Sequence, residues 1–287
     1  MFAVGALMVI VSGGIDVSFT AIASLSMYAT TRILLNVNYS GNVMLAYAMG
    51  AGFGLLMGAF NAILIAKFKF PTLIVTLGTA SIFTGIMNGV LGAHELPVPP
   101  SMSVHGKAKL FSAYNTQLGL NSNMPVTILL LVGLLIIAFI ILRYTMLGRG
   151  IYAIGGDEVS AQRAGFNVFA IRIFIYCFVG AIAGITGIAR ASMMLDCHPT
   201  NLLGMELTVI AAVVLGGARV TGGTGSLTGT MLGVALMTIM SNSLILIGIP
   251  TYWTSVFTGA IIIIGTGVSA YQFLRSKKHL VASQRDL

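Results

Sequence analysis

The sequence predicts an all-α fold, a polytopic helical membrane protein with a single transmembrane domain over residues 1-287. Of its 287 residues, 57% are hydrophobic and only 8% are charged, whereas an average soluble domain is about 25% charged. Several apolar runs approach or exceed the ~20 residues with which a helix crosses a ~30 Å hydrocarbon core. No run alternates with the period of two that is typical of a membrane barrel strand. These observations together favour a bundle of membrane helices.

The order of apolar and polar runs predicts about eight apolar segments, for which nine candidate runs are present, two short and seven long. Two of them, Met1 to Ser12 and Met205 to Leu215, are too short to cross a membrane. The longer ones run from Val17 to Leu35, Asn42 to Ala66, Thr72 to Leu91, Pro125 to Leu142, Phe169 to Ala189, Ser226 to Ile247 and Trp253 to Phe273. The polar intervals between them, above all Gly92 to Met124 and 143-168, are expected to be loops.

Each short segment ends at a pair of glycines, Gly13 and Gly14 in the first and Gly216 and Gly217 in the second. A glycine inside a helix costs about 1 kcal/mol relative to alanine, so these pairs indicate broken helices. In both cases a full span, a turn and another full span follow. The sequence therefore predicts two parallel repeats, 2-66 and 205-273, aligned with Gly13 over Gly216.

The two breaks hold candidate functional residues. Their residues are Gly13, Gly14, Asp16, Ser18, Gly216, Gly217, Arg219, Gly222 and Gly223. The alignment sets Asp16 opposite Arg219, and an ionisable side chain at membrane depth needs a partner. One hypothesis is that the breaks meet and that these two side chains form an ion pair. The other is that each charge caps its own helix or reaches the membrane interface.

Other glycines recur every four residues, a spacing that lets helix backbones approach closely in lipid. Such ladders are predicted helix-packing faces, and they comprise Gly50, Gly54 and Gly58, then Gly180 and Gly184, then Gly225, Gly229 and Gly233.

The distribution of basic residues predicts the orientation. If the spans alternate, the segments Lys67 to Phe70, Arg143 to Arg172 and Arg275 to Leu287 share one side, and they hold most of the Lys and Arg residues. The positive-inside rule makes this side, and the C-terminus, cytoplasmic. The net charge of +8 thus indicates a lipid bilayer as partner and no nucleic acid.

The cytoplasmic loop 143-168 contains a predicted short helix. Gly155 and Gly156 stop the preceding element, Asp157 is a good N-cap and Glu158 favours the helix dipole, whereas Gly165 supplies a left-handed stop. A capped, charged helix in this loop is either a docking element or a solvated connector.

Three motifs resemble those of the permease subunits of bacterial ABC importers of the ribose type, a family that also handles other sugars and autoinducer-2. The segment from Gly155 to Gly165 is similar to the family's GGNPEAARxSG signature. GGIDVS at Gly13 to Ser18 is similar to its GGIDLS motif, and Leu215 to Gly233 to its LGGxxxxGGxGSxxGTxxG motif. Asp157 stands where the family commonly has Asn, and family members carry a further helix before GGID, so the resemblance implies that this chain lacks its N-terminal helix.

The resemblance implies a multi-pass protein of the bacterial cytoplasmic (inner) membrane that imports a small neutral polar solute, most often a monosaccharide. Its partners would be a separate ATPase subunit that binds ATP and Mg, a periplasmic or lipid-anchored substrate-binding protein, and a second permease subunit. The short helix would couple to the ATPase through Gly155, Gly156, Asp157, Glu158, Ala161, Arg163 and Gly165.

The residues agree with a transport subunit that is no enzyme and binds no cofactor itself. No GxxxxGK[ST] motif occurs. The four histidines show no metal-ligand spacing, and Cys177 and Cys197 indicate neither a disulfide nor a metal site. The alternative is an ion-coupled secondary transporter of a small polar solute. Such coupling normally uses several intramembrane carboxylates, and here only Asp16 and Glu206 are available.

Overall fold

The computed structural model describes residues 1–250, apart from 93 and 116–119, and a few positions between 253 and 267. The described chain is mostly helical. Its helices are α1 (Phe2–Val11), α2 (Phe19–Asn36), α3 (Val43–Phe68), α4 (Thr72–Gly89), α5 (Pro100–Lys107), α6 (Ile128–Tyr144), α7 (Met146–Gly156), α8 (Glu158–Arg163), α9 (Val168–Met194), α10 (Glu206–Leu215) and α11 (Leu227–Leu246). Four short strands are β1 (Leu96–Pro97), β2 (Lys109–Asn115), β3 (Leu120–Pro125) and β4 (Asp196–Cys197).

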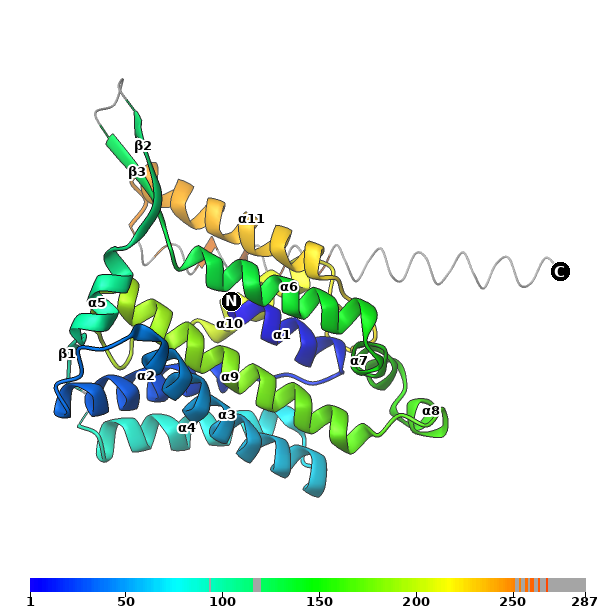
Figure 1. Cartoon of the computed structure of the whole chain (residues 1–287). Coiled ribbons are helices and arrows are strands. Elements are labelled where there is room, and N and C mark those ends of the chain that lie inside the picture. Colours follow the sequence, from blue (N-terminus) through cyan, green and yellow to red (C-terminus); the bar gives the residue numbers. More distant parts are fainter. Residues whose placement is uncertain are drawn as a thin grey trace.

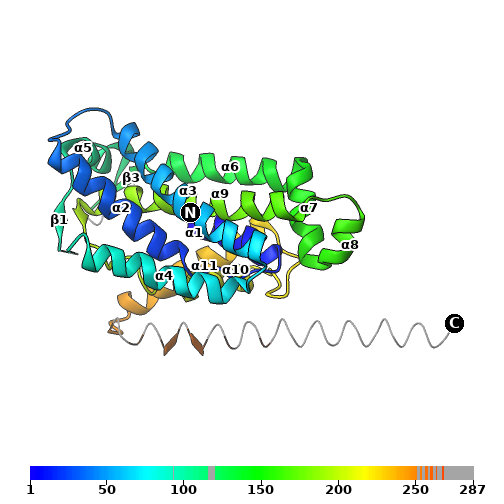
Figure 2. The same cartoon turned by 90° about the horizontal axis from the view of Figure 1, so that it is seen from below.

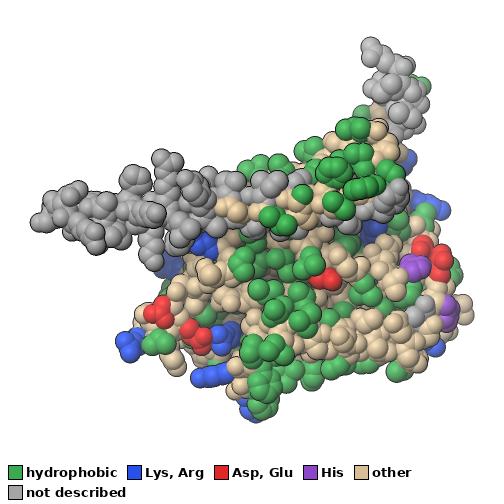
Figure 3. Space-filling view, turned by 180° about the vertical axis from the view of Figure 1, so that it is seen from behind, with side chains coloured by type: hydrophobic (Ala, Val, Ile, Leu, Met, Phe, Trp, Pro, Cys, Tyr) green, Lys and Arg blue, Asp and Glu red, His purple; other side chains and the backbone are tan. Residues whose placement is uncertain are grey.

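The long helices run side by side between two distinct ends of the molecule (Figures 1 and 2). One end carries α7 and α8 and is called the α8 end below; the other carries α5 and the strands and is called the α5 end. Charged side chains gather toward these ends, and hydrophobic side chains cover much of the surface between them (Figure 3). This distribution is the one expected of a bundle that spans a membrane.

The predicted membrane-helix class is confirmed, whereas the number of about eight apolar segments is not confirmed in the described chain. Helices α3, α4, α9 and α11 are long and apolar enough to cross a membrane, and α6 joined to α7 is a fifth candidate with a 71° bend. The predicted last span, Trp253 to Phe273, and the basic tail fall largely or wholly outside the described residues.

Both predicted breaks are present, and both begin in the same way. The amide of Gly13 donates to the carbonyl oxygen three residues back (2.9 Å) and that of Gly14 to the one five residues back (3.0 Å). Gly217 and Ala218 repeat this pattern at the end of α10 (2.9 and 3.3 Å). Gly13 (φ 82°) and Gly217 (φ 90°) are left-handed, as the Schellman stop of a helix requires.

This shared stop pairs Gly13 with Gly217, one residue away from the predicted alignment of Gly13 with Gly216. Gly13 corresponds to Gly217, not to Gly216, and α1 and α10 then match along their full ten residues. In this register Ile15 corresponds to Arg219. Aligning the glycine pairs gave the wrong correspondence, because the left-handed glycine is the first of the pair Gly13–Gly14 but the second of the pair Gly216–Gly217.

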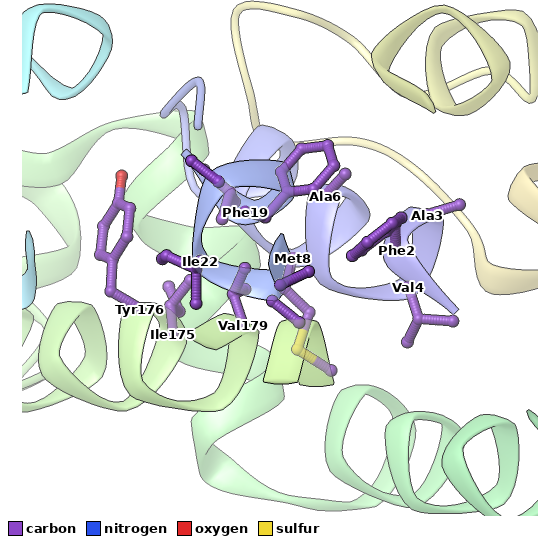
Figure 4. Close-up of a cluster of buried hydrophobic side chains, with 14 of the residues drawn as sticks. Phe2, Ala3, Val4, Ala6, Met8, Phe19, Ile22, Ile175, Tyr176 and Val179 are labelled. Atoms are coloured by element: carbon purple, nitrogen blue, oxygen red, sulfur yellow. The ribbon is translucent and has the colours of Figure 1, made fainter. Parts of the chain in front are cut away.

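Helix α1 is the centre of the bundle, and every one of its residues is buried. Figure 4 shows part of this cluster, in which α1 side chains such as Met8 lie near Phe19 and Ile22 of α2 and Val179 of α9. The rings of Phe2 and Phe19 are 5.1 Å apart. A ten-residue helix has too few hydrogen bonds to persist alone, so this packing is what holds it.

The predicted glycine ladders of α3 and α9 pack against each other. A Cβ at Gly54 would overlap the carbonyl oxygen of Gly180, and one at Gly184 would overlap that of Gly50. A Cβ at Gly58 would meet the backbone of Tyr176. The two backbones thus touch directly, as small residues in membrane helices permit.

The interval Gly92 to Met124 is more structured than the predicted loop. It contains α5 and a hairpin in which β2 pairs antiparallel with β3. In addition, β1 pairs antiparallel with β4, so that Leu96 faces Cys197. This pairing confirms that the loops before α6 and after α9 share one end of the bundle, the α5 end.

Candidate coupling and translocation site

Three glycine segments that lie far apart in the sequence meet at the α8 end of the bundle. They are the end of α1, the end of α7 and the second break. A Cβ at Gly222 would lie 2.8 Å from the Cα of Gly13, and a Cβ at Gly223 would lie 3.0 Å from the Cα of Gly156. The predicted meeting of the two breaks is therefore observed, and the loop that precedes α8 is part of it.

Gly155 is the most tightly enclosed glycine of this junction. A Cβ on it would overlap the carbonyl oxygen of Val11 and would lie 2.5 Å from the nitrogen of Gly223. Next to it, the hydroxyl of Tyr152 donates to the carbonyl oxygen of Gly225 (2.9 Å). Helix α7 thus contacts the backbones of both breaks directly.

Helix α8 begins and ends as the sequence predicts. The carboxylate of Asp157 accepts hydrogen bonds from the amide of Val159 (3.0 Å) and the hydroxyl of Ser160 (2.6 Å). These bonds hold the pKa of the Asp157 carboxyl below its usual value. Gly165 (φ 89°) closes the helix in the left-handed conformation. The N-cap at one end and the Schellman stop at the other fix this six-residue helix.

Helix α8 projects from the α8 end with one face against the bundle and the other outside (Figure 1). Ala161 faces inward and is 3% exposed, whereas Arg163 is exposed. Glu158 forms an ion pair with Arg172 of α9, with 2.6 Å between Oε2 and an arginine NH2 nitrogen. The ion pair joins the start of α8 to the base of a membrane helix.

The first break continues as an extended segment along α4. The amide of Ile15 donates to the hydroxyl of Thr72 (3.1 Å), and the amide of Val17 donates to that of Thr76 (3.3 Å). Backbone groups inside a membrane need partners within the protein. These two threonines supply them.

Asp16 lies at the centre of a buried polar group. Its Oδ1 accepts from the amide of Ser18 (2.7 Å) and from the hydroxyl of Ser18 (2.6 Å). The side-chain amide of Asn61 on α3 donates in turn to that hydroxyl (2.8 Å). Asp16 and Ser18 thus tie the first break to α3, and the second hypothesis, that Asp16 caps its own segment, describes its role better.

The ion pair between Asp16 and Arg219 is not present. Asp16 is 3% exposed, whereas Arg219 is exposed, and its amide donates to the carbonyl oxygen of Thr224 (3.0 Å). In the part of the chain that the structure describes, the ion pair is the one between Glu158 and Arg172. The two side chains lie in different surroundings, because Asp16 is buried beside Ser18 and Arg219 is exposed in the turn of the second break.

The remaining predicted residues of the second break determine its backbone conformation and its packing. Gly216 packs against the backbone of Gly229 on α11, Gly217 makes the stop, and Gly222 (φ 91°) and Gly223 (φ 76°) make the turn that reaches α7. Gly233 packs on Ala212 of α10. The predicted packing face is therefore confirmed for Gly229 and Gly233. Gly225 does not belong to it, because it lies before α11 and meets Val11 and Leu7 of α1.

Sequence reasoning missed α7, whose Tyr152 binds the second break. It also missed the polar residues that support the first break, namely Asn61, Thr72 and Thr76. A signal for α7 does exist: Thr145 is an N-cap whose hydroxyl accepts from the amide of Gly148 (3.1 Å), and Leu147, Ile151 and Ile154 recur at helical spacing. Among the described residues no three His, Cys, Asp or Glu side chains gather as metal ligands.

Comparison with known proteins gives a family and several relatives. The family described as "Branched-chain amino acid transport system / permease component" matches residues 1–265. The ribose import permease protein RbsC of Escherichia coli K12 is 31% identical over 264 residues, which are 92% of this chain and 79% of that protein. The Bacillus subtilis protein of the same name is also 31% identical, over 265 residues, with the same coverage of both chains.

A third relative is the autoinducer 2 import system permease protein LsrC of Yersinia enterocolitica. It is 31% identical over 265 residues, which are 92% of this chain and 69% of that protein. No solved structure matches the chain.

Proposed function

The chain belongs to the family of branched-chain amino acid transport permease components, and we propose that it carries a small neutral polar solute, a monosaccharide, through the membrane by using ATP hydrolysed on a partner subunit. The observation that carries this proposal is the contact of Gly155, at the end of α7, with Val11 and Gly223. It links the helix that projects from the bundle to the two interrupted crossings.

The proposed coupling runs from the ATPase through α8 to the breaks. Two exposed residues of α8, Val159 (56% exposed) and Arg163, offer an apolar and a basic contact to the partner. Because α8 is capped at both ends and joined to α9 by the Glu158–Arg172 ion pair, force on it would reach α7 and α9 together. The α8 end is then cytoplasmic, as the positive-inside rule predicts.

The proposed partners at the α5 end are a soluble or lipid-anchored binding protein and, alongside the bundle, a second permease subunit. The α5 end has an ordered surface made of secondary structure. The β1–β4 pair joins two of its loops, and the β2–β3 hairpin extends from them. Exposed Phe111 and Tyr114 on β2 would contact the binding protein. ATP and Mg would be bound by the ATPase subunit.

The proposed substrate class rests on the names of the relatives and on the chemistry of the spans. Two of the relatives above are named for ribose and one for autoinducer 2. Few ionisable side chains lie in the long helices of this chain, which suits a solute without net charge.

Reconstituted transport tests the proposal. The chain is placed in proteoliposomes with its ATPase and binding protein, and uptake of ¹⁴C-ribose is measured with and without ATP and under sodium or proton gradients. The expected result is uptake that requires ATP and is unaffected by the gradients. Ala161→Pro, which breaks α8, should abolish ATP-driven uptake while membrane insertion remains. Uptake that follows an ion gradient without nucleotide would favour a secondary transporter and end the proposal.

A further inference from the structure

A cavity of about 660 Å³ lies between α2, α4 and the start of α10. This volume is within the roughly 300–1,000 Å³ that small-molecule sites occupy. Apolar residues such as Val17 and Leu207 form part of its wall. Its polar side chains are Thr20, Ser81, Thr84, Asn88 and Glu206.

The polar residues of α4 in this cavity form one face of that helix. Ser81, Thr84 and Asn88 follow each other at spacings of three and four residues, which places them on one side of an α-helix. Ser81 and Asn88 are exposed and Thr84 is half-buried. A stripe of polar side chains along a membrane helix faces a polar path or a partner more favourably than it faces lipid.

Glu206 is the charged group of the cavity. Its Oε2 accepts from the hydroxyl of Thr20 (3.0 Å) and from the amide of Gly204 (3.0 Å). Thr20 belongs to the first turn of α2, just beyond the first break. Within the described chain both of these bonds end on Oε2, so Oε1 keeps its lone pairs for a ligand in the cavity.

The cavity and the first break use different parts of α4. Thr72 and Thr76, at the α8 end of the helix, hold the extended segment of the break. The cavity begins at Leu77 and reaches Asn88 near the opposite end. Polar side chains of α4 therefore line the cavity from the α5 end to the middle of the helix. Nearer the α8 end, the extended backbone of the first break lies against α4 instead.

We propose that this cavity is a solute-binding site within the membrane, where Glu206 and the hydroxyl and amide side chains of Thr20, Ser81, Thr84 and Asn88 take a neutral polyhydroxylated solute. This inference rests on the proposed function and assigns residues to it. A carboxylate is a strong acceptor for solute hydroxyl groups, since hydrogen bonds to a charged group are about twice as strong as neutral ones. The apolar wall would pack against the C–H faces of the solute.

The first test replaces the carboxylate with minimal structural change. Glu206→Gln keeps a carbonyl oxygen for the bonds from Thr20 and Gly204 but removes the charge. In proteoliposomes with ATPase and binding protein, the uptake rate of ¹⁴C-ribose should fall about tenfold, the difference between a charge-assisted and a neutral hydrogen bond. ATP hydrolysis stimulated by the binding protein should stay within about twofold. Glu95→Gln, the same change at an exposed loop residue, should alter neither.

The second test fills the cavity. Thr84→Trp places a large ring inside it and should block uptake, whereas Ile86→Trp, two residues away and outside the lining, should not. The inference is overturned if Glu206→Gln transports like the unmodified chain, if hydrolysis falls in parallel with uptake, or if the two tryptophan variants behave alike. Uptake by the unmodified chain that follows an ion gradient without nucleotide would instead overturn the proposed function on which the inference rests.

Discussion

The backbone amide of Gly223 donates a 2.8 Å hydrogen bond to the carbonyl oxygen of Val11. Val11 is the last residue of α1, where carbonyl groups lack partners within the helix. The second break therefore satisfies the end of the helix that precedes the first break. Because Gly155 packs on the same two groups, the two breaks and α7 form one contiguous unit. Five predictions follow from this junction and from the rest of the bundle.

Gly155→Ala should uncouple transport. The added methyl group would overlap the Val11 carbonyl oxygen and crowd the Gly223 amide, so α7 must move away from the breaks. We expect ATP-driven uptake to fall at least tenfold, measured in proteoliposomes together with ATP hydrolysis. Gly156→Ala is the matched control, because nothing lies within 4 Å of its added Cβ. Equal uptake by the two variants would contradict the mechanical role of the junction.

Gly54→Ala should destabilise the bundle. Its methyl group would overlap the carbonyl oxygen of Gly180 and separate α3 from α9. Overpacking of this kind typically costs about 1–3 kcal/mol, which a lowered melting temperature in detergent would show. Gly52→Ala adds the same methyl group on the same helix where nothing lies within 4 Å. That variant should melt like the unmodified protein, and a similar loss in both would rule out the packing explanation.

Ser18→Ala should weaken the first break. The Ser18 hydroxyl connects the carboxylate of Asp16 to the side-chain amide of Asn61. Its removal deprives each of these buried groups of one hydrogen bond. The expected loss of unfolding free energy is about 1–3 kcal/mol, measured by denaturation in detergent. Ser26→Ala is the control, since this buried hydroxyl on α2 has no hydrogen-bond partner among the described residues.

The charge swap of Asp16→Arg with Arg219→Asp tests the same region. Since these two residues do not form an ion pair, the double variant should be no more stable than Asp16→Arg alone. Recovery of stability in the double variant would show that the two charges interact.

The Asp157 cap predicts the pH range over which α8 is stable. Hydrogen bonds from Ser160 and Val159 lower the pKa of this carboxyl below its ordinary 3.8. The cap therefore contributes stability above the unfolded pKa and loses it as the pH falls through the lower folded value. Amide exchange of α8, corrected for intrinsic rates, should show constant protection between about pH 5 and 8. Asp157→Ala should lose that protection throughout this range, and an unchanged exchange rate would contradict the cap.

The sequence predicted the elements whose cause is local. Glycine pairs mark both breaks, because only glycine adopts the left-handed stop without strain. Asp157 and Gly165 mark the ends of α8, and four-residue glycine spacing marks the packing faces of α3 and α9. The hairpin of β2 and β3 was missed because its polar and apolar residues are mixed and resemble a loop. Helix α7 was missed although its apolar residues have helical spacing, because its glycines and Arg149 interrupt the apolar pattern.

The sequence by itself thus determined the membrane-helix class, the two interrupted crossings, the capped helix α8 and the relationship to the permease family. Tertiary structure decided which residues meet. The partner of Asp16 is Ser18 and not Arg219, because Asp16 is buried beside Ser18 whereas Arg219 is exposed. The contact of Gly155 with Val11 and Gly223, and the cavity around Glu206, join segments with no shared pattern. Such contacts are determined by how the backbones pack in three dimensions, because the composition is compatible with many other contacts.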